Sequence, residues 1–171
     1  MSVHKLPTAA DEERFWGLVE AAWAGLGPEV AALRRAVAKG EAEDPYALDV
    51  HLNAFIENLT ALCADLSRTE LTDLDRVVER KLYDIDREEI QAVTDGSDDG
   101  FLYCRGFIVA MGREFYDAVD ADPTRAIEDA ECEDMCYFFA RLYGTRFGED
   151  WPSTGAGISR ESVSNRAGWS T

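Results

Sequence analysis

The stretch Asp95-Gly-Ser-Asp-Asp-Gly-Phe101, continued by Leu102-Tyr-Cys-Arg-Gly-Phe-Ile-Val-Ala-Met111, joins an acidic turn to the most apolar run of the chain. Its first glycine suits the end of one helix, and the serine after it suits the cap of the next. Two aspartates then fall in the first helical turn, where carboxylates complement the helix dipole. As a helix, residues 101–111 are apolar on almost every side, which is typical of a buried central helix. The length of the apolar pattern favours a helix over a strand.

One charged side chain, Arg105, interrupts this apolar run. A buried charge without a partner costs several kcal/mol, so we expect Arg105 to pair with a carboxylate from the region Asp86–Asp99. Asp98 would lie on the same helix face two turns away, where a bridging ligand or water could close the gap. Gly106 and Ala110 are four residues apart, a small pair that would let a second helix approach closely.

Helical periodicity covers most of the remaining chain. Thr8–Asp11, Ser67–Glu70 and Asp86–Glu89 have the spacing of capping boxes, which mark helix starts. A long amphipathic helix is predicted to begin at Asp44-Pro45, and in a last helix the apolar residues at 132–143 share one face.

The length of 171 residues and the apolar content of 46% suit one globular domain with a sizeable core. We predict a single compact all-α domain of about six to seven helices over residues 8–148. Residues 149–171 are rich in serine and glycine and have no apolar period, so a flexible C-terminal tail is expected there. Trp169 belongs either to this unstructured end or to an anchor that enters a groove.

The net charge of −17 repels nucleic acid and acidic lipid and attracts basic proteins. We therefore expect a basic protein partner or a small ligand, and neither nucleic acid nor membrane. An acidic protein that mimics DNA is a remote alternative. No apolar run approaches the roughly 20 residues of a membrane span, and the N-terminal residues lack a signal-peptide pattern, so a cytoplasmic location is expected.

The chain contains four cysteines and two histidines. In a cytoplasmic protein such cysteines are expected to be reduced and buried, and neither histidine has a partner at ligand spacing, so no zinc site and no cofactor are predicted. The cysteines are Cys63, Cys104, Cys132 and Cys136.

The acidic turn resembles the beginning of a calcium-binding loop. The position that should carry a bidentate glutamate is Gly106, which excludes an EF-hand. A looser magnesium or calcium site from Asp95, Asp98 and Asp99 remains an alternative. No phosphate-binding glycine loop, serine elbow or Cys–His pair is present in the sequence.

The motif Ser97-Asp-Asp-Gly-Phe101, with Arg105-Gly106 and Gly112-Arg113-Glu114 after it, resembles a bacterial family of unknown function, numbered forty-two forty. The resemblance is specific over residues 97–123 and extends to the Phe15-Trp16 region. Members of that family also occur fused to WGR modules. The resemblance implies a mainly helical fold and no established activity.

Two functions are compatible with this sequence. We expect a non-enzymatic binding or regulatory module, with a partner or ligand site around the Ser97-Asp98-Asp99 turn, Tyr103 and Arg105. The alternative is a metal-assisted hydrolase with Asp95, Asp98 and Asp99 as ligands, in which the arginine would hold an anion. No catalytic residue is predicted.

Overall fold

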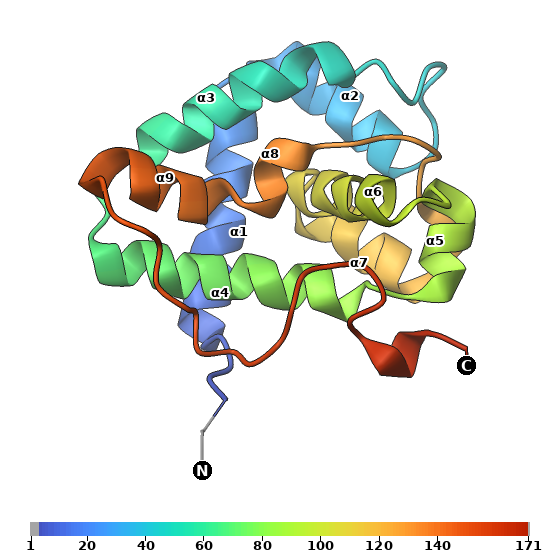
Figure 1. Ribbon diagram of the computed structural model, residues 1–171. Helices are drawn as coiled ribbons and strands as arrows, with labels where there is room; N and C mark the ends of the chain where they lie inside the picture. The colour runs from blue at the N-terminus through green and yellow to red at the C-terminus, as the bar shows by residue number, and fades with distance from the viewer. Residues whose placement is uncertain (1–3, 171) are drawn as a thin grey trace.

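A computed structural model describes residues 4–170. This part of the chain contains nine α-helices and three short 3-10 turns, and no strand (Figure 1). The predicted all-α class is confirmed, although eight helices have seven residues or more where six to seven were expected. The helices are α1 (Ala9–Ala24), α2 (Pro28–Ala38), α3 (Leu52–Leu62), α4 (Arg68–Asp84), α5 (Glu88–Thr94), α6 (Asp98–Ala110), α7 (Arg113–Ala121), α8 (Glu133–Cys136) and α9 (Phe138–Phe147).

Helix α6 is the central helix, as its apolar sequence predicts. It packs against α4, α7 and α8, and every residue from Gly100 to Ala110 except Tyr103 is buried. Ser97 caps the helix, because its hydroxyl accepts a hydrogen bond from the Gly100 amide at 3.1 Å. The acidic turn therefore does what its sequence indicates: it ends α5 and begins α6.

A close helix contact forms at Gly106. A Cβ atom at this position would overlap with the Cys132 carbonyl oxygen and would lie 2.6 Å from the Cys136 sulfur. The close approach expected from the small pair in α6 is confirmed, and the neighbouring helix is α8.

Helix α3 begins later than predicted. Asp44 accepts a hydrogen bond from the Tyr46 amide at 2.9 Å, which closes a turn. A 3-10 turn (Asp49–His51) follows, and the α-helix starts only at Leu52. The aspartate before the proline therefore caps a turn instead of the long amphipathic helix.

The predicted last helix is interrupted at Tyr137, whose backbone angles are φ −127° and ψ 25°. The Cys136 carbonyl just before the break accepts a hydrogen bond from the Arg160 side chain at 2.6 Å. At the junction of α8 and α9, this carbonyl is therefore hydrogen-bonded to a side chain from a distant part of the chain.

The C-terminal segment, residues 149–170, has no element longer than the 3-10 turn Arg166–Gly168. It leaves the end of α9, crosses α4 and continues toward α5 (Figure 1, orange to red). Thr154, Ala156 and Arg160 are buried in these contacts. The lack of regular structure agrees with the sequence prediction, but the segment is packed where a flexible tail was expected. The reason is that polar contacts hold the segment in place. Residues that make such contacts do not produce a periodic apolar pattern in the sequence.

All four cysteines are free and buried, as expected. None of the helices between residues 4 and 170 combines the length and the apolar character needed to cross a membrane.

Candidate ligand-binding site on helix α4

The four residues predicted to bind a partner do not meet in one cleft. Asp98 and Asp99 are exposed at the start of α6, and Tyr103 is half-buried. Arg105 has no exposed surface at all. A ligand on the surface can therefore reach the two aspartates and the tyrosine, whereas Arg105 lies beneath the C-terminal segment.

The prediction that Arg105 pairs with a carboxylate is wrong. Its guanidinium donates to the Leu82 carbonyl at 2.8 Å and to the Ser162 hydroxyl at 3.1 Å, and it lies over the Phe101 ring at 4.7 Å from the centroid. Among residues 4–170, no carboxylate oxygen forms an ion pair with it within 4.0 Å. Burial lowers the pKa of Arg105, and the negative charge of Asp86 opposes this shift.

Ser162 closes the gap that separates Arg105 from Asp98. Its hydroxyl accepts from Arg105 and donates to the Asp98 carbonyl at 2.6 Å. In place of the expected ligand or water, a side chain of the C-terminal segment links Arg105 to the backbone carbonyl of Asp98.

The predicted metal ligands also separate. A carboxylate oxygen of Asp95 lies within 4.8 Å of the Cys104 sulfur and of a Glu131 oxygen, and Asp98 and Asp99 are not part of this group. Burial raises the pKa of Cys104 to about 12, with the negative charges of Glu131 and Asp95 adding to the shift. The thiol therefore holds its proton at neutral pH.

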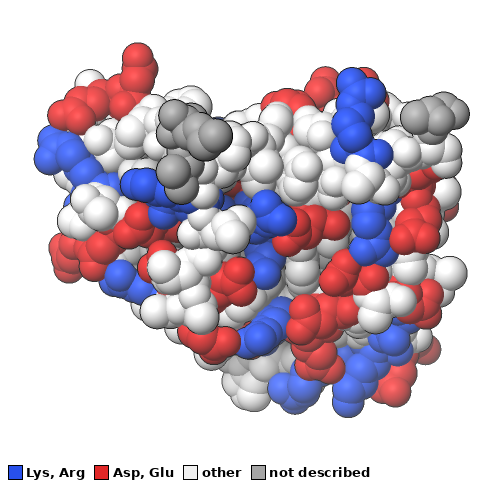
Figure 2. Space-filling model, turned by 90° about the horizontal axis from the view of Figure 1, so that it is seen from below, with Lys and Arg blue, Asp and Glu red and all other residues white. Residues whose placement is uncertain are grey.

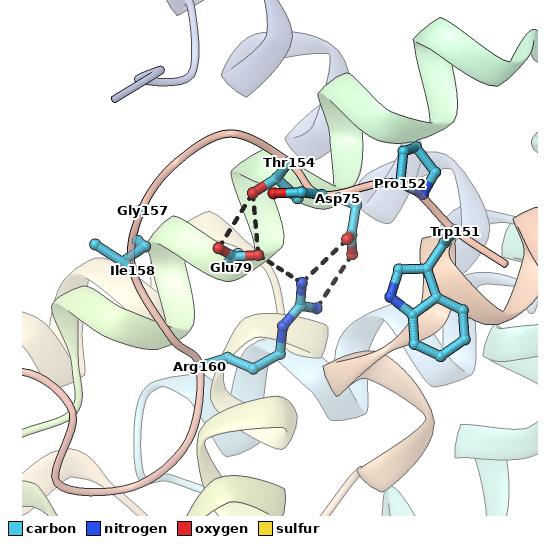
Figure 3. A pocket seen from close by; sticks show the side chains of 9 residues that line it. Asp75, Glu79, Trp151, Pro152, Thr154, Gly157, Ile158 and Arg160 are labelled. Atoms are coloured by element: carbon cyan, nitrogen blue, oxygen red, sulfur yellow. Dashed lines mark hydrogen bonds and ion pairs between the residues drawn. The ribbon is translucent and has the colours of Figure 1, made fainter. Parts of the chain in front are cut away.

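A different set of charged side chains converges on α4. Asp75 and Glu79 are one helical turn apart on the same face, and only 4% and 8% of their surfaces are exposed. Arg160 of the C-terminal segment enters between them (Figure 3). Its guanidinium donates to both oxygens of Asp75, at 3.1 and 3.0 Å, and to Glu79 at 2.9 Å. Burial acts to lower the pKa of Arg160, but the two carboxylates outweigh it and the pKa is raised.

Thr154 completes this arrangement. Its hydroxyl lies 3.2 Å from each Glu79 oxygen, and its carbonyl accepts from the Arg76 side chain at 2.6 Å. Arg76 is held in turn by an ion pair with Asp73 at 2.9 Å. The C-terminal segment is therefore fixed to α4 at two points, before and at Arg160.

A pocket of about 420 Å³ opens between this cluster and residues 151–158. Trp151 forms part of its wall (Figure 3), and its side chain is half-exposed. Two negative charges and one positive charge line the pocket, which leaves a local net charge of −1. The lining residues are Asp75, Glu79, Trp151, Pro152, Ser153, Thr154, Gly157, Ile158 and Arg160.

The surface seen from below in Figure 1 has interspersed acidic and basic side chains rather than one large acidic field (Figure 2). On this face the excess negative charge of the chain is therefore not gathered into a single patch.

A family model described as "Protein of unknown function (DUF4240)" matches residues 10–145. The chain belongs to this family. The resemblance seen in the sequence is thereby confirmed, and the matched range contains all but the first residue of α1, the whole of α2 to α8 and most of α9. No curated protein and no solved structure matches the chain.

Sequence reasoning missed Asp75, Glu79 and Arg160. The two acids resemble the solvated face of an amphipathic helix, but each directly follows a residue of the apolar stripe, Leu74 or Val78. Two acids one helical turn apart, beside an apolar stripe, were the sequence signal that could have identified this site. Both lie within the matched family domain, whereas Arg160 lies beyond it.

Proposed function

We propose that the protein is a non-enzymatic binding module whose pocket on α4 takes a positively charged group. One observation carries this proposal: Asp75 and Glu79 are almost fully buried and already hold a guanidinium, that of Arg160. Buried carboxylates are stable only with hydrogen-bonded partners, so this geometry selects cationic donors.

The carboxylates have acceptor capacity to spare. A carboxylate oxygen can accept about two hydrogen bonds, and within residues 4–170 only Thr154 donates to the Oε1 atom of Glu79. With a net charge of −1 around the pocket, one additional ammonium or guanidinium group would balance the site.

The remaining wall favours a ligand with an apolar part. The exposed face of Trp151 can attract a cation through its ring electrons or cover an alkyl chain. A volume of about 420 Å³ suits a small organic cation, since ligand pockets commonly have about 300–1,000 Å³.

The exposed Asp98 and Asp99 and the half-buried Tyr103 remain part of the proposal as an acidic surface that attracts basic groups. A cytoplasmic location belongs to the same proposal. The net charge of −17 supports a basic partner over an acidic one.

The test is a titration with butylguanidinium, with butylurea as an uncharged ligand of nearly equal shape. Isothermal titration calorimetry should show binding of butylguanidinium alone, and added salt should weaken it. Trp151→Ala should reduce the affinity without touching the carboxylates, and Glu79→Gln should abolish it. Glu133→Gln, at the exposed start of α8, serves as the matched control and should bind as the wild type does. Equal binding of the two ligands, or no heat with either at millimolar concentration, would overturn the proposal.

A further inference from the structure

The C-terminal segment lies on the domain in the manner of a bound peptide. Its fixed points follow one another along the chain: Arg160 between two carboxylates, Ser162 on α6, and residues 163–169 on Asp86. Peptide grooves commonly combine a pocket for one side chain with acceptors for the peptide backbone.

Asp86 supplies the backbone recognition. It is fully buried, and its carboxylate accepts from the Val163 amide at 3.0 Å and the Asn165 amide at 2.9 Å. The indole N–H of Trp169 donates to the same carboxylate at 3.0 Å. All three donors belong to the C-terminal segment, so another chain that presents two amides and one side-chain donor in this geometry could replace them.

The segment is also strained where Asp86 holds it. Val163 has φ 67°, a left-handed conformation that is unfavourable for a β-branched residue. The hydrogen bonds to Asp86 must offset this cost. A competing segment with a glycine or asparagine at this position would adopt the left-handed conformation without this energetic cost.

Few apolar side chains of the segment are deeply buried. Among the hydrophobic residues of the segment, Ala156 is buried and Trp169 is half-buried. The rings of Trp169 and Phe101 meet edge to face, with 5.9 Å between their centroids. Polar contacts, even buried ones, can be exchanged for those of another chain without exposing a large hydrophobic core.

The residues that receive the segment belong to the family domain. Asp75, Glu79, Asp86 and Arg105 lie within residues 10–145, whereas the segment begins after the matched range. We call these four residues and the Asp98 carbonyl the α4–α6 groove.

We propose that the α4–α6 groove binds an extended, arginine-bearing segment of a basic partner protein, and that residues 149–170 occupy it until the partner arrives. This inference rests on the proposed function, because it uses the same pair of carboxylates. The partner arginine would enter between Asp75 and Glu79, and backbone amides three and five residues later would meet Asp86. A second copy of the chain is disfavoured as the occupant, because two molecules with a net charge of −17 repel each other.

The test uses the full chain and a fluorescein-labelled peptide of residues 151–170. In the double variant Ser162→Ala with Trp169→Ala, the segment is loosened while every acidic residue of the groove is kept. Fluorescence anisotropy should show at least tenfold tighter peptide binding to this variant than to the wild type. The same peptide with Arg160→Ala should not bind, and a peptide extended by three lysines should bind more tightly at low salt.

Arg141→Ala, on the exposed face of α9, is the matched control and should bind the peptide as weakly as the wild type. Hydrogen exchange of residues 158–170 verifies that the double variant has loosened the segment. No binding to a loosened variant, or equal binding of the peptide without arginine, would overturn the inference. A wild-type dimer in light scattering, with exchanged C-terminal segments, would overturn the choice of a foreign partner. If butylguanidinium binds while the peptide does not, the proposed function stands and this inference fails.

Discussion

Arg160 and Asp75 form a two-pronged ion pair, with Nη1 3.1 Å from Oδ1 and Nη2 3.0 Å from Oδ2. The two residues are 85 positions apart in the chain, so this contact fastens the C-terminal segment to the middle of the domain. Both side chains are almost fully buried, where an ion pair is stable only if its remaining donors and acceptors are also used. The Cys136 carbonyl takes one of these donors.

Removing Arg160 should therefore destabilise the whole domain. Arg160→Ala leaves Asp75 and Glu79 buried beside each other without a cation, and breaking a buried pair costs about 3–5 kcal/mol. Urea denaturation followed by circular dichroism measures this loss in the free energy of unfolding. Arg141→Ala removes an arginine whose ion pairs are exposed, and it should change little. A loss below about 1 kcal/mol for Arg160→Ala would contradict the importance of the pair.

Arg105 should respond differently to substitution, because no carboxylate among residues 4–170 forms an ion pair with it. Arg105→Ala leaves a cavity and removes the donor of the Leu82 carbonyl, whereas Arg105→Met fills the space and removes the cost of burying a charge. Both variants leave the Leu82 carbonyl without its donor, but only alanine leaves a cavity, so we expect Arg105→Met to be more stable than Arg105→Ala by about 2–5 kcal/mol in thermal or urea denaturation. If the two variants are equally destabilised, the positive charge itself is needed.

Gly106 should tolerate no side chain. Gly106→Ala places a methyl group against the Cys132 carbonyl and the Cys136 sulfur, and overpacking of this kind costs typically about 1–3 kcal/mol. Gly17→Ala is the matched control, because a Cβ there meets nothing within 4 Å in the middle of α1. It should stabilise the protein by about 0.5–1 kcal/mol through helix propensity. A Gly106→Ala variant as stable as Gly17→Ala would show that α6 and α8 can separate at little cost.

Local signals in the sequence were sufficient for most of the fold. Ser67 and Ser97 cap helices as predicted, since a cap depends only on residues within one turn. The apolar run, broken only by Arg105, identified α6 as the central helix for the same reason. The start of α3 and the break at Tyr137 were not predictable in this way. The start of α3 depends on a competing turn at Asp44. The break at Tyr137 lies where the side chain of Arg160, 24 residues away from Cys136, donates a hydrogen bond to the Cys136 carbonyl.

The candidate site was less predictable, because it is built from residues far apart in the chain. The sequence marked Arg105 as a buried cation that needs partners, and this was correct. It could not show that a backbone carbonyl and Ser162 would be those partners, or that Asp86 would serve the amides of residues 163 and 165. Polar contacts of this kind have no period, so residues 149–170 looked like a flexible tail.

The four buried cysteines should make the protein sensitive to alkaline pH. Burial raises the pKa of Cys63 to about 11 and the pKa values of Cys104, Cys132 and Cys136 to about 12, from an ordinary value of 9.0. Above pH 9 the thiols ionise in the unfolded chain while the folded chain keeps them protonated. The unfolded state then binds fewer protons, so the free energy of unfolding falls as pH rises from about 9 to 12.

Each thiol contributes at most about 1.4 kcal/mol per pH unit to this fall. Urea denaturation at pH 8 and at pH 10.5 should therefore show a smaller loss for Cys136→Ala than for the wild type, even though the variant is less stable at pH 8. Thr94→Val is the matched control, because it alters a buried side chain without removing a titratable group. It should change the free energy of unfolding by the same amount at pH 8 and at pH 10.5. Comparison with the wild type also cancels the titration of tyrosine and lysine. An identical pH dependence in Cys136→Ala and wild type would show that this thiol ionises as readily in the folded chain as in the unfolded one, and would contradict its burial.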